Sequence, residues 1–153
     1  MFGLAFALTS ATKIAFIGCN LAGPPSVWAT IDEPGAARCD LGWLEGELAN
    51  LRAEGYIPVF TFQHNEVYIP SGSDTLRRDF LRIAEAGAAI VSGSQAHFPQ
   101  GFAFHAGAYV HYGLGNLFFD QFNRRDDAGK APQVKCRPPS ALTCRIFPHC
   151  ETV

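Results

Sequence analysis

The chain has 153 residues, of which 48% are hydrophobic and 17% are charged, and its formal net charge at pH 7 is −2. A chain of this size and composition can bury one hydrophobic core, which excludes a disordered protein. The absence of a basic stripe argues against nucleic acid as a partner. No apolar run reaches the roughly 18 residues that a membrane span needs, so we expect no membrane segment.

The first eleven residues, MFGLAFALTSA, superficially resemble a secretion signal. They lack a positively charged start, and their apolar stretch is at the short limit for a signal core. A buried edge strand or a truncated helix is the expected structure.

Four apolar, strand-like runs each lead into a loop rich in polar residues. The runs are 14–17, 57–62, 88–91 and 108–112, and the loops after them begin GCN, QHNE, SGSQAH and GLGN. In an open α/β sheet, ligands bind beyond the carboxyl ends of the strands. We therefore expect the four loops to converge on one metal or phosphate site.

Two helices are predicted between these strands. The first has an apolar face with steps of three and four residues, with Asp40 as its N-cap and Gly55 closing it; that face consists of Leu41, Leu44, Leu48 and Leu51. The second runs from about residue 74 to 86 and stops at Gly87, and Ser71 and Asp74 have capping-box spacing. Its inward residues are expected to be Leu76, Phe80, Ile83 and Ala84.

Strands that alternate with helices of this length predict an α/β fold, with right-handed βαβ crossovers and a mostly parallel sheet. A turn at Ala106-Gly107 is expected to join 102–105 to 108–112 in a terminal β-hairpin. His105 and His111 flank that turn and are expected to be cross-strand or surface histidines. We place the domain at 1–123 and interpret 124–153, which has scattered prolines and no periodicity, as a poorly ordered tail.

The five cysteines form no C-x-x-C pair, so a standard zinc ribbon or thioredoxin-type motif is absent. Cys19 and Cys39 flank a long loop rich in glycine and proline. A disulfide between them and two unrelated buried thiols are both compatible with the sequence.

Two histidines are candidates for chemistry. His64 directly follows a buried strand and has Glu66 two residues later, which favours a ligand or acid–base role. His97 lies in a turn where Gly93 permits close backbone approach and Pro99 stiffens the exit. We expect His64 and His97 to face the same cleft. Farther along the chain, the 113–116 turn is a weak candidate for anion binding, and Asp120 for a cation ligand or a turn residue.

These residues carry a family resemblance. His64 with Glu66, then Gly93…His97-x-x-Gln100-Gly101, then YGLGNLFFD at 112–120 resemble the motifs of the CapA-type poly-γ-glutamate capsule-synthesis proteins, in the same order. That family belongs to the calcineurin-like metallophosphoesterase superfamily. The resemblance spans roughly residues 13–121 and implies part of a calcineurin-like fold.

The resemblance implies a centre with two divalent metal ions in the intact domain, in which His64 and His97 are metal ligands and, with Glu66, the catalytic residues. Such ions polarise a phosphoryl or acyl oxygen and lower the pKa of bound water from about 15.7 towards about 7. It further implies a phosphoester or anionic-polymer substrate, and a place at the cell surface or the membrane. The residues expected to bind the ligand are Asn20, Gln63, Gln95, Gln100 and Asn116.

The sequence departs from the family pattern at several points. Ser94 and Gln95 stand where the family has two histidines, and Asn65 stands where tryptophan is usual. The family's upstream Gly-Asp and Asn-Asn-His motifs do not occur here, so the sequence looks like the C-terminal portion of the domain. We therefore expect weak metal binding and little hydrolysis by this chain alone. The alternatives are a non-catalytic component that binds or assembles an anionic cell-surface polymer, and a fragment without function.

Overall fold

The structure is a computed structural model that describes residues 5–9 and 12–116, with backbone alone described for 5–9. The predicted tail at 124–153, the boundary at 123 and the candidate ligand Asp120 lie outside the described residues.

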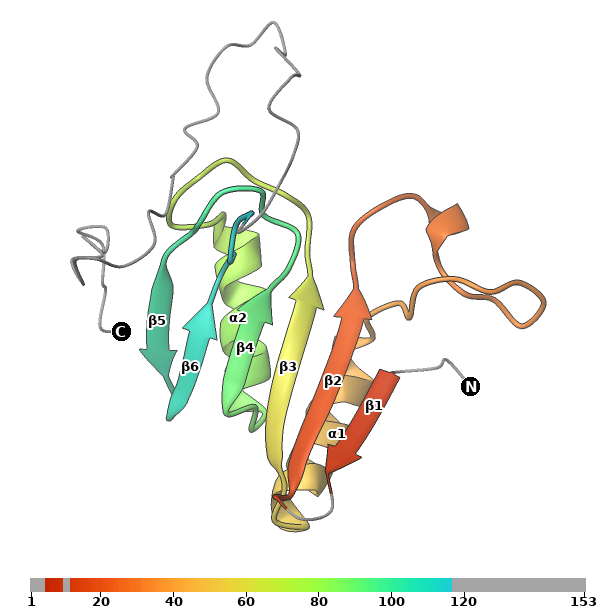
Figure 1. Cartoon of the computed structure of the whole chain (residues 1–153), viewed down its shortest axis with the longest axis vertical. Coiled ribbons are helices and arrows are strands. Elements are labelled where there is room, and N and C mark those ends of the chain that lie inside the picture. Colours follow the sequence, from red (N-terminus) through yellow and green to blue (C-terminus); the bar gives the residue numbers. More distant parts are fainter. Residues whose placement is uncertain (1–4, 10–11, 117–153) are drawn as a thin grey trace, which may run out of the picture.

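Six strands form one sheet in the order β1-β2-β3-β4-β6-β5 (Figure 1). The three central pairings, β2 with β3, β3 with β4 and β4 with β6, are parallel, while β1 and β5 pair antiparallel at the two edges. The mostly parallel α/β fold expected from the sequence is confirmed, including the edge strand near the N-terminus. The strands are β1 Ala5–Thr9, β2 Ile14–Asn20, β3 Ile57–Gln63, β4 Ile90–Gly93, β5 Phe102–His105 and β6 Ala108–His111.

Two helices, α1 (Leu41–Ala53) and α2 (Asp74–Glu85), make the β2-to-β3 and β3-to-β4 crossovers. Asp40 caps α1 as predicted, since its side chain accepts a hydrogen bond from the Trp43 amide (3.1 Å). The predicted cap of α2 is wrong by two residues: Ser73, not Ser71, accepts from the Leu76 amide (3.2 Å). The hydroxyl must lie three residues before the amide that it caps, and α2 begins at Asp74.

Both helices cover the same face of the sheet (Figure 1). Alternate residues of the strands point into the layer between sheet and helices, where they meet the apolar faces of α1 and α2. The largest fully buried side chains include Phe60, Phe62, Phe80, Leu44, Leu48 and Ile83. The opposite face of the sheet carries no described helix or strand.

The hairpin forms where the sequence placed it. Ala106 and Gly107 both have positive φ (49° and 78°), which is the backbone conformation of a tight two-residue hairpin turn. The register pairs His105 with Ala108 and His111 with Phe102, so the two histidines do not face each other. His105 bonds to Glu85 of α2 instead (2.7 Å).

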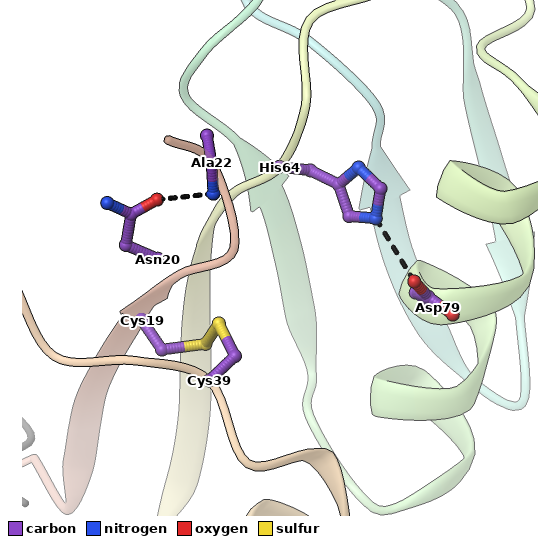
Figure 2. The surroundings of a disulfide bond; sticks show 6 residues. All are labelled: Cys19, Asn20, Ala22, Cys39, His64 and Asp79. Atoms are coloured by element: carbon purple, nitrogen blue, oxygen red, sulfur yellow. Dashed lines mark hydrogen bonds and ion pairs between the residues drawn. A yellow bond between two sulfur atoms is a disulfide. The ribbon is translucent and has the colours of Figure 1, made fainter. Parts of the chain in front are cut away.

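Cys19 and Cys39 form a disulfide (Cα–Cα 5.0 Å), so the alternative of two unrelated thiols is wrong (Figure 2). The bond links the end of β2 to the residue before the Asp40 cap. It closes the long loop that contains the 3-10 turn Pro25–Val27, and both cysteines are buried. The loop after β2 is thereby fixed to the start of α1.

Candidate functional site

A small pocket lies at the carboxyl ends of the central strands, where the loops after β3, β4 and β6 meet. Its volume of about 10 Å³ is close to the smallest cavity that can hold one water molecule. Three strand ends thus converge on one pocket. Its lining comprises Phe62, His64, Asn65, Glu66, Val67, Leu76, Gly93, Gln95, Ala96, Gln100 and Tyr112.

A buried histidine–aspartate pair lies at this site, with His64 in the pocket lining and Asp79 behind it on α2. Figure 2 shows the His64 ring extending from the end of β3 toward α2, where its Nε2 lies 3.0 Å from Asp79 Oδ2. Both residues are 6% exposed. Because an ionised carboxylate only accepts hydrogen bonds, Nε2 carries the proton and donates to Asp79. Asp79 therefore fixes both the orientation and the tautomer of the ring.

Packing also holds the His64 ring. It makes edge contacts with Phe62 and Phe80, with ring centroids 5.3 and 6.2 Å apart. The Arg78 guanidinium donates to the other oxygen of Asp79 (3.1 Å). Both the ring and its carboxylate partner are consequently held from more than one side.

Two buried polar atoms of the pocket residues have no hydrogen-bond partner: His64 Nδ1 and Gln100 Oε1. When the ring carries a single proton, on Nε2, Nδ1 presents a lone pair, and Gln100 Oε1 is an acceptor as well. A buried polar atom without a partner is costly and rare. Two unmatched acceptors suit an occupant that supplies positive charge or hydrogen-bond donors.

Gln100 also joins the loops of the site. Its Nε2 donates to the carbonyls of Val67 (2.8 Å) and Ile69 (3.1 Å), and its backbone amide donates to Gly113 O (2.8 Å). One buried residue, through its side chain and its backbone amide, thus links the loop after β3 to the segment after β6. Its predicted ligand contact can involve Oε1 alone, because the amide nitrogen is committed to the backbone.

A second set of contacts lies beside the pocket. The His97 amide donates to Glu66 Oε1 (3.2 Å), and Asn116 Nδ2 lies 3.2 Å from His97 Nδ1. Three predicted site residues are therefore brought together, and Glu66 belongs to the pocket as well. His97 is exposed and does not line the pocket, so a metal ion shared by His64 and His97 stays a prediction.

The remaining predicted ligands divide between two places. Gln95 lines the pocket, whereas Asn20 and Gln63 do not. These two are register partners at the ends of β2 and β3. Gln63 precedes His64, and because side chains alternate along a strand, Gln63 points to the opposite face. Asn20 Oδ1 accepts from the Ala22 amide (2.6 Å), which gives it a turn-stabilising contact.

The glycines of the 93–115 region have a steric role. A Cβ on Gly93 would collide with the carbonyl of Tyr112, and one on Gly113 would lie 2.7 Å from Gln100 Oε1. In the 113–116 turn, the Leu114 and Asn116 amides donate to the carbonyls of Gly93 and His97. The close backbone approach expected at Gly93 is confirmed, and these two amides serve packing between loops.

Asp79 is the site residue that the sequence interpretation missed. It lies on α2 three residues after Leu76 and four before Ile83, which places a carboxylate on the buried face of the helix. A charged residue at an inward position of an amphipathic helix is seldom buried without a partner. That mismatch was the available signal.

The polar side chains of the pocket meet the needs of a metal ion in part. His64 fits one ligand position, because ligating histidines usually donate their second ring nitrogen to a carboxylate, as His64 does to Asp79. Within residues 12–116, however, no group of three or more His, Cys, Asp or Glu side chains is placed to hold an ion. The described residues therefore offer part of a metal site.

Fold and site together define an α/β protein with a polar pocket, built around an oriented histidine, at the carboxyl edge of its sheet. The family described as bacterial capsule synthesis protein (PGA_cap) matches residues 3–121, and the chain belongs to this family. No curated protein and no solved structure matches the chain significantly. Neither described helix is long and apolar enough to cross a membrane.

Proposed function

We propose that this capsule-synthesis protein acts on a phosphoester or another anionic polymer unit through a metal-dependent centre at the His64 pocket. One observation carries the proposal. His64 is buried and oriented by Asp79 through Nε2, while Nδ1 is left without a partner. A histidine with one nitrogen fixed by a carboxylate and the other unmatched has the arrangement of a metal ligand or a general base.

The surroundings of His64 support a cation. Glu66 contributes a carboxylate to the same pocket, and Gln100 contributes an unmatched carbonyl oxygen. A bound divalent ion would supply a Lewis acid for a phosphoryl oxygen. His64 and Glu66 would hold the ion, and Asp79 would keep the imidazole in one tautomer. Gln100 would hold the loops of the site together.

We infer that this chain provides part of the ligand set. A catalytic metal site in a protein ordinarily has about three protein ligands, and the described pocket supplies one histidine and one carboxylate. His97, joined to Glu66 through its backbone amide, is the candidate for a second imidazole. Weak metal affinity and little hydrolysis are expected until further ligands are supplied from outside the described residues.

The disulfide bears on location. A bond between Cys19 and Cys39 persists in an oxidising compartment and is rare in the cytosol. We therefore propose that the protein works in an oxidising compartment outside the cytoplasm.

A second candidate function is non-catalytic binding of an anionic polymer. The observation in its favour is the lack of a cluster of three metal-ligand side chains within residues 12–116. The site then holds polymer through amides and ordered water, and it needs no ion.

Calorimetric titration of Mn²⁺ or Zn²⁺ into the purified chain tests the main proposal. Binding should be weak, should disappear in His64→Asn, and should fall about 10–100-fold in Asp79→Asn, which removes the orienting carboxylate. His105→Asn is the matched control, because His105 pairs with an acidic residue far from the pocket. Equal affinity in His64→Asn and the wild type would refute the role of His64.

Titration with poly-γ-glutamate, with and without metal, separates the two functions. Polymer binding that does not depend on metal and persists in His64→Asn favours the non-catalytic function. Metal-dependent hydrolysis of bis(p-nitrophenyl) phosphate favours the main proposal.

A further inference from the structure

The orientation of the Gln100 amide is fixed by the partners of its nitrogen. Nε2 donates to the carbonyl oxygens of Val67 (2.8 Å) and Ile69 (3.1 Å). If the amide were turned over, its oxygen would face two carbonyls, which can only accept hydrogen bonds. Oε1 is therefore the atom that Gln100 leaves without a partner, and it is an acceptor.

The His64 ring is fixed in the same way. Nε2 lies 3.0 Å from Asp79 Oδ2, and the other nitrogen, Nδ1, lies on the side of the ring away from that carboxylate (Figure 2). Nδ1 is buried and has no partner. His64 and Gln100 line the same pocket and are 6% and 3% exposed. The pocket therefore has two buried acceptors whose orientation is already determined by their other contacts.

The size of the pocket restricts what can donate to these acceptors. Its volume of about 10 Å³ is close to the least that holds one water molecule, and a buried water needs at least two polar partners. Phe62, Leu76 and Ala96 form apolar parts of the wall, and their side chains offer no hydrogen bond. A water molecule has two O–H donors, and the two buried acceptors are the atoms that need them.

We propose that one ordered water molecule is a built-in part of this pocket, where it donates one hydrogen bond to His64 Nδ1 and the other to Gln100 Oε1. The water completes a hydrogen-bonded chain that runs from Asp79 on α2, through His64 and Gln100, to the loop after β3. Both of its hydrogens are then committed to the protein, so a ligand that enters the pocket either displaces the water or donates a hydrogen bond to its oxygen. The inference rests on the two unmatched acceptors and does not depend on a bound metal ion.

A high-resolution crystal structure of the full chain, grown in the presence of a chelator, tests this proposal. The wild type should show one solvent peak that lies about 2.7–3.2 Å from both His64 Nδ1 and Gln100 Oε1. Because the chelator removes metal ions, this result is independent of whether the site binds a metal.

Two pocket variants and one control sharpen the test. Ala96→Val should remove the peak, because Ala96 lines the pocket, is 8% exposed, and the two added methyl groups take the space of the water. Gln100→Met should remove it by taking away one of the two acceptors. Ala103→Val should keep the peak, since Ala103 is 3% exposed on β5 and does not line the pocket.

Circular dichroism melts confirm that each variant is folded, and two pocket variants guard against the loss of one of them. A wild-type pocket without a solvent peak overturns the proposal, as does a peak within hydrogen-bond distance of one acceptor alone. A peak that persists in both pocket variants overturns it equally, because other groups then hold the water.

Discussion

Breaking the Cys19–Cys39 bond should lower the free energy of unfolding by an amount that follows from the length of the loop that the bond closes. The two cysteines are 20 residues apart in sequence. In the chain-entropy model a cross-link over a loop of that length stabilises the native state by about 3 kcal/mol. For a domain of this general size, that corresponds to a fall in melting temperature of roughly 10 °C. Because both cysteines are buried against the core, the replacement should be Ala, which adds no polar group.

Thermal unfolding of Cys19→Ala, Cys39→Ala and the double variant provides the assay, with and without reducing agent. Each single variant already removes the bond. The double variant should therefore be nearly as stable as either single variant. Its loss in the free energy of unfolding should be well below the sum of the losses of the two single variants. Reducing agent should lower the melting temperature of the wild type alone. Peptide mapping under non-reducing conditions identifies the pair directly.

Additive effects of the two substitutions, together with a wild type insensitive to reducing agent, would refute this reasoning. That outcome is what two independent buried thiols produce, since each then contributes only its own packing.

Three further predictions concern stability. Ser73→Ala should cost about 1 kcal/mol in chemical denaturation because it removes the cap of α2, whereas Ser71→Ala should stay within about 0.5 kcal/mol, and the reverse order would contradict the cap assignment. Burial lowers the pKa of His111 below its usual 6.5, so between the folded and the unfolded pKa the unfolded chain binds more protons than the folded one. The contribution of His111 to stability should therefore be fully present above about pH 6.5 and should decrease as the pH falls below it. His111→Gln should reduce this loss of stability relative to the wild type. Deletion of residues 124–153 should leave the melting temperature nearly unchanged, and a fall of more than a few degrees would show that these residues pack against the domain.

Most of the fold followed from local patterns in the sequence. Alternation of apolar runs with helices such as α1 predicted the parallel sheet, and Ala106-Gly107 predicted the hairpin, since both signals depend on residues close in sequence. The cap of α2 was misplaced because Ser71 and Ser73 both precede the helix within one turn. Cap identity depends on where the first helical residue falls, and boundaries are the least determined part of a sequence pattern.

The site was predictable in part. The carboxyl ends of β3 and β4 placed His64, Glu66 and Gln95 at one pocket, as the position of polar loops in α/β sheets requires. The local pattern placed the Asp79 carboxylate on the inward face of α2, but its partner His64 is fifteen residues away in sequence and is identified only by the packing of α2 on the sheet. His97 was expected to face the same cleft as His64; it does not line the pocket, and its contacts include Glu66 and Asn116, because the direction of a side chain within a loop is set by tertiary contacts.

The orientation of the His64 ring is the central claim, and nitrogen NMR of the histidine side chains tests it most directly. In the wild type at neutral pH, the His64 signals should show a proton on Nε2 and an unprotonated Nδ1, and Zn²⁺ should shift the Nδ1 signal selectively. In Asp79→Asn the strong preference for this tautomer should weaken, because the carboxylate acceptor is gone. A proton on Nδ1 with Nε2 bare in the wild type, or a Zn²⁺ titration that leaves Nδ1 unmoved, would contradict the account.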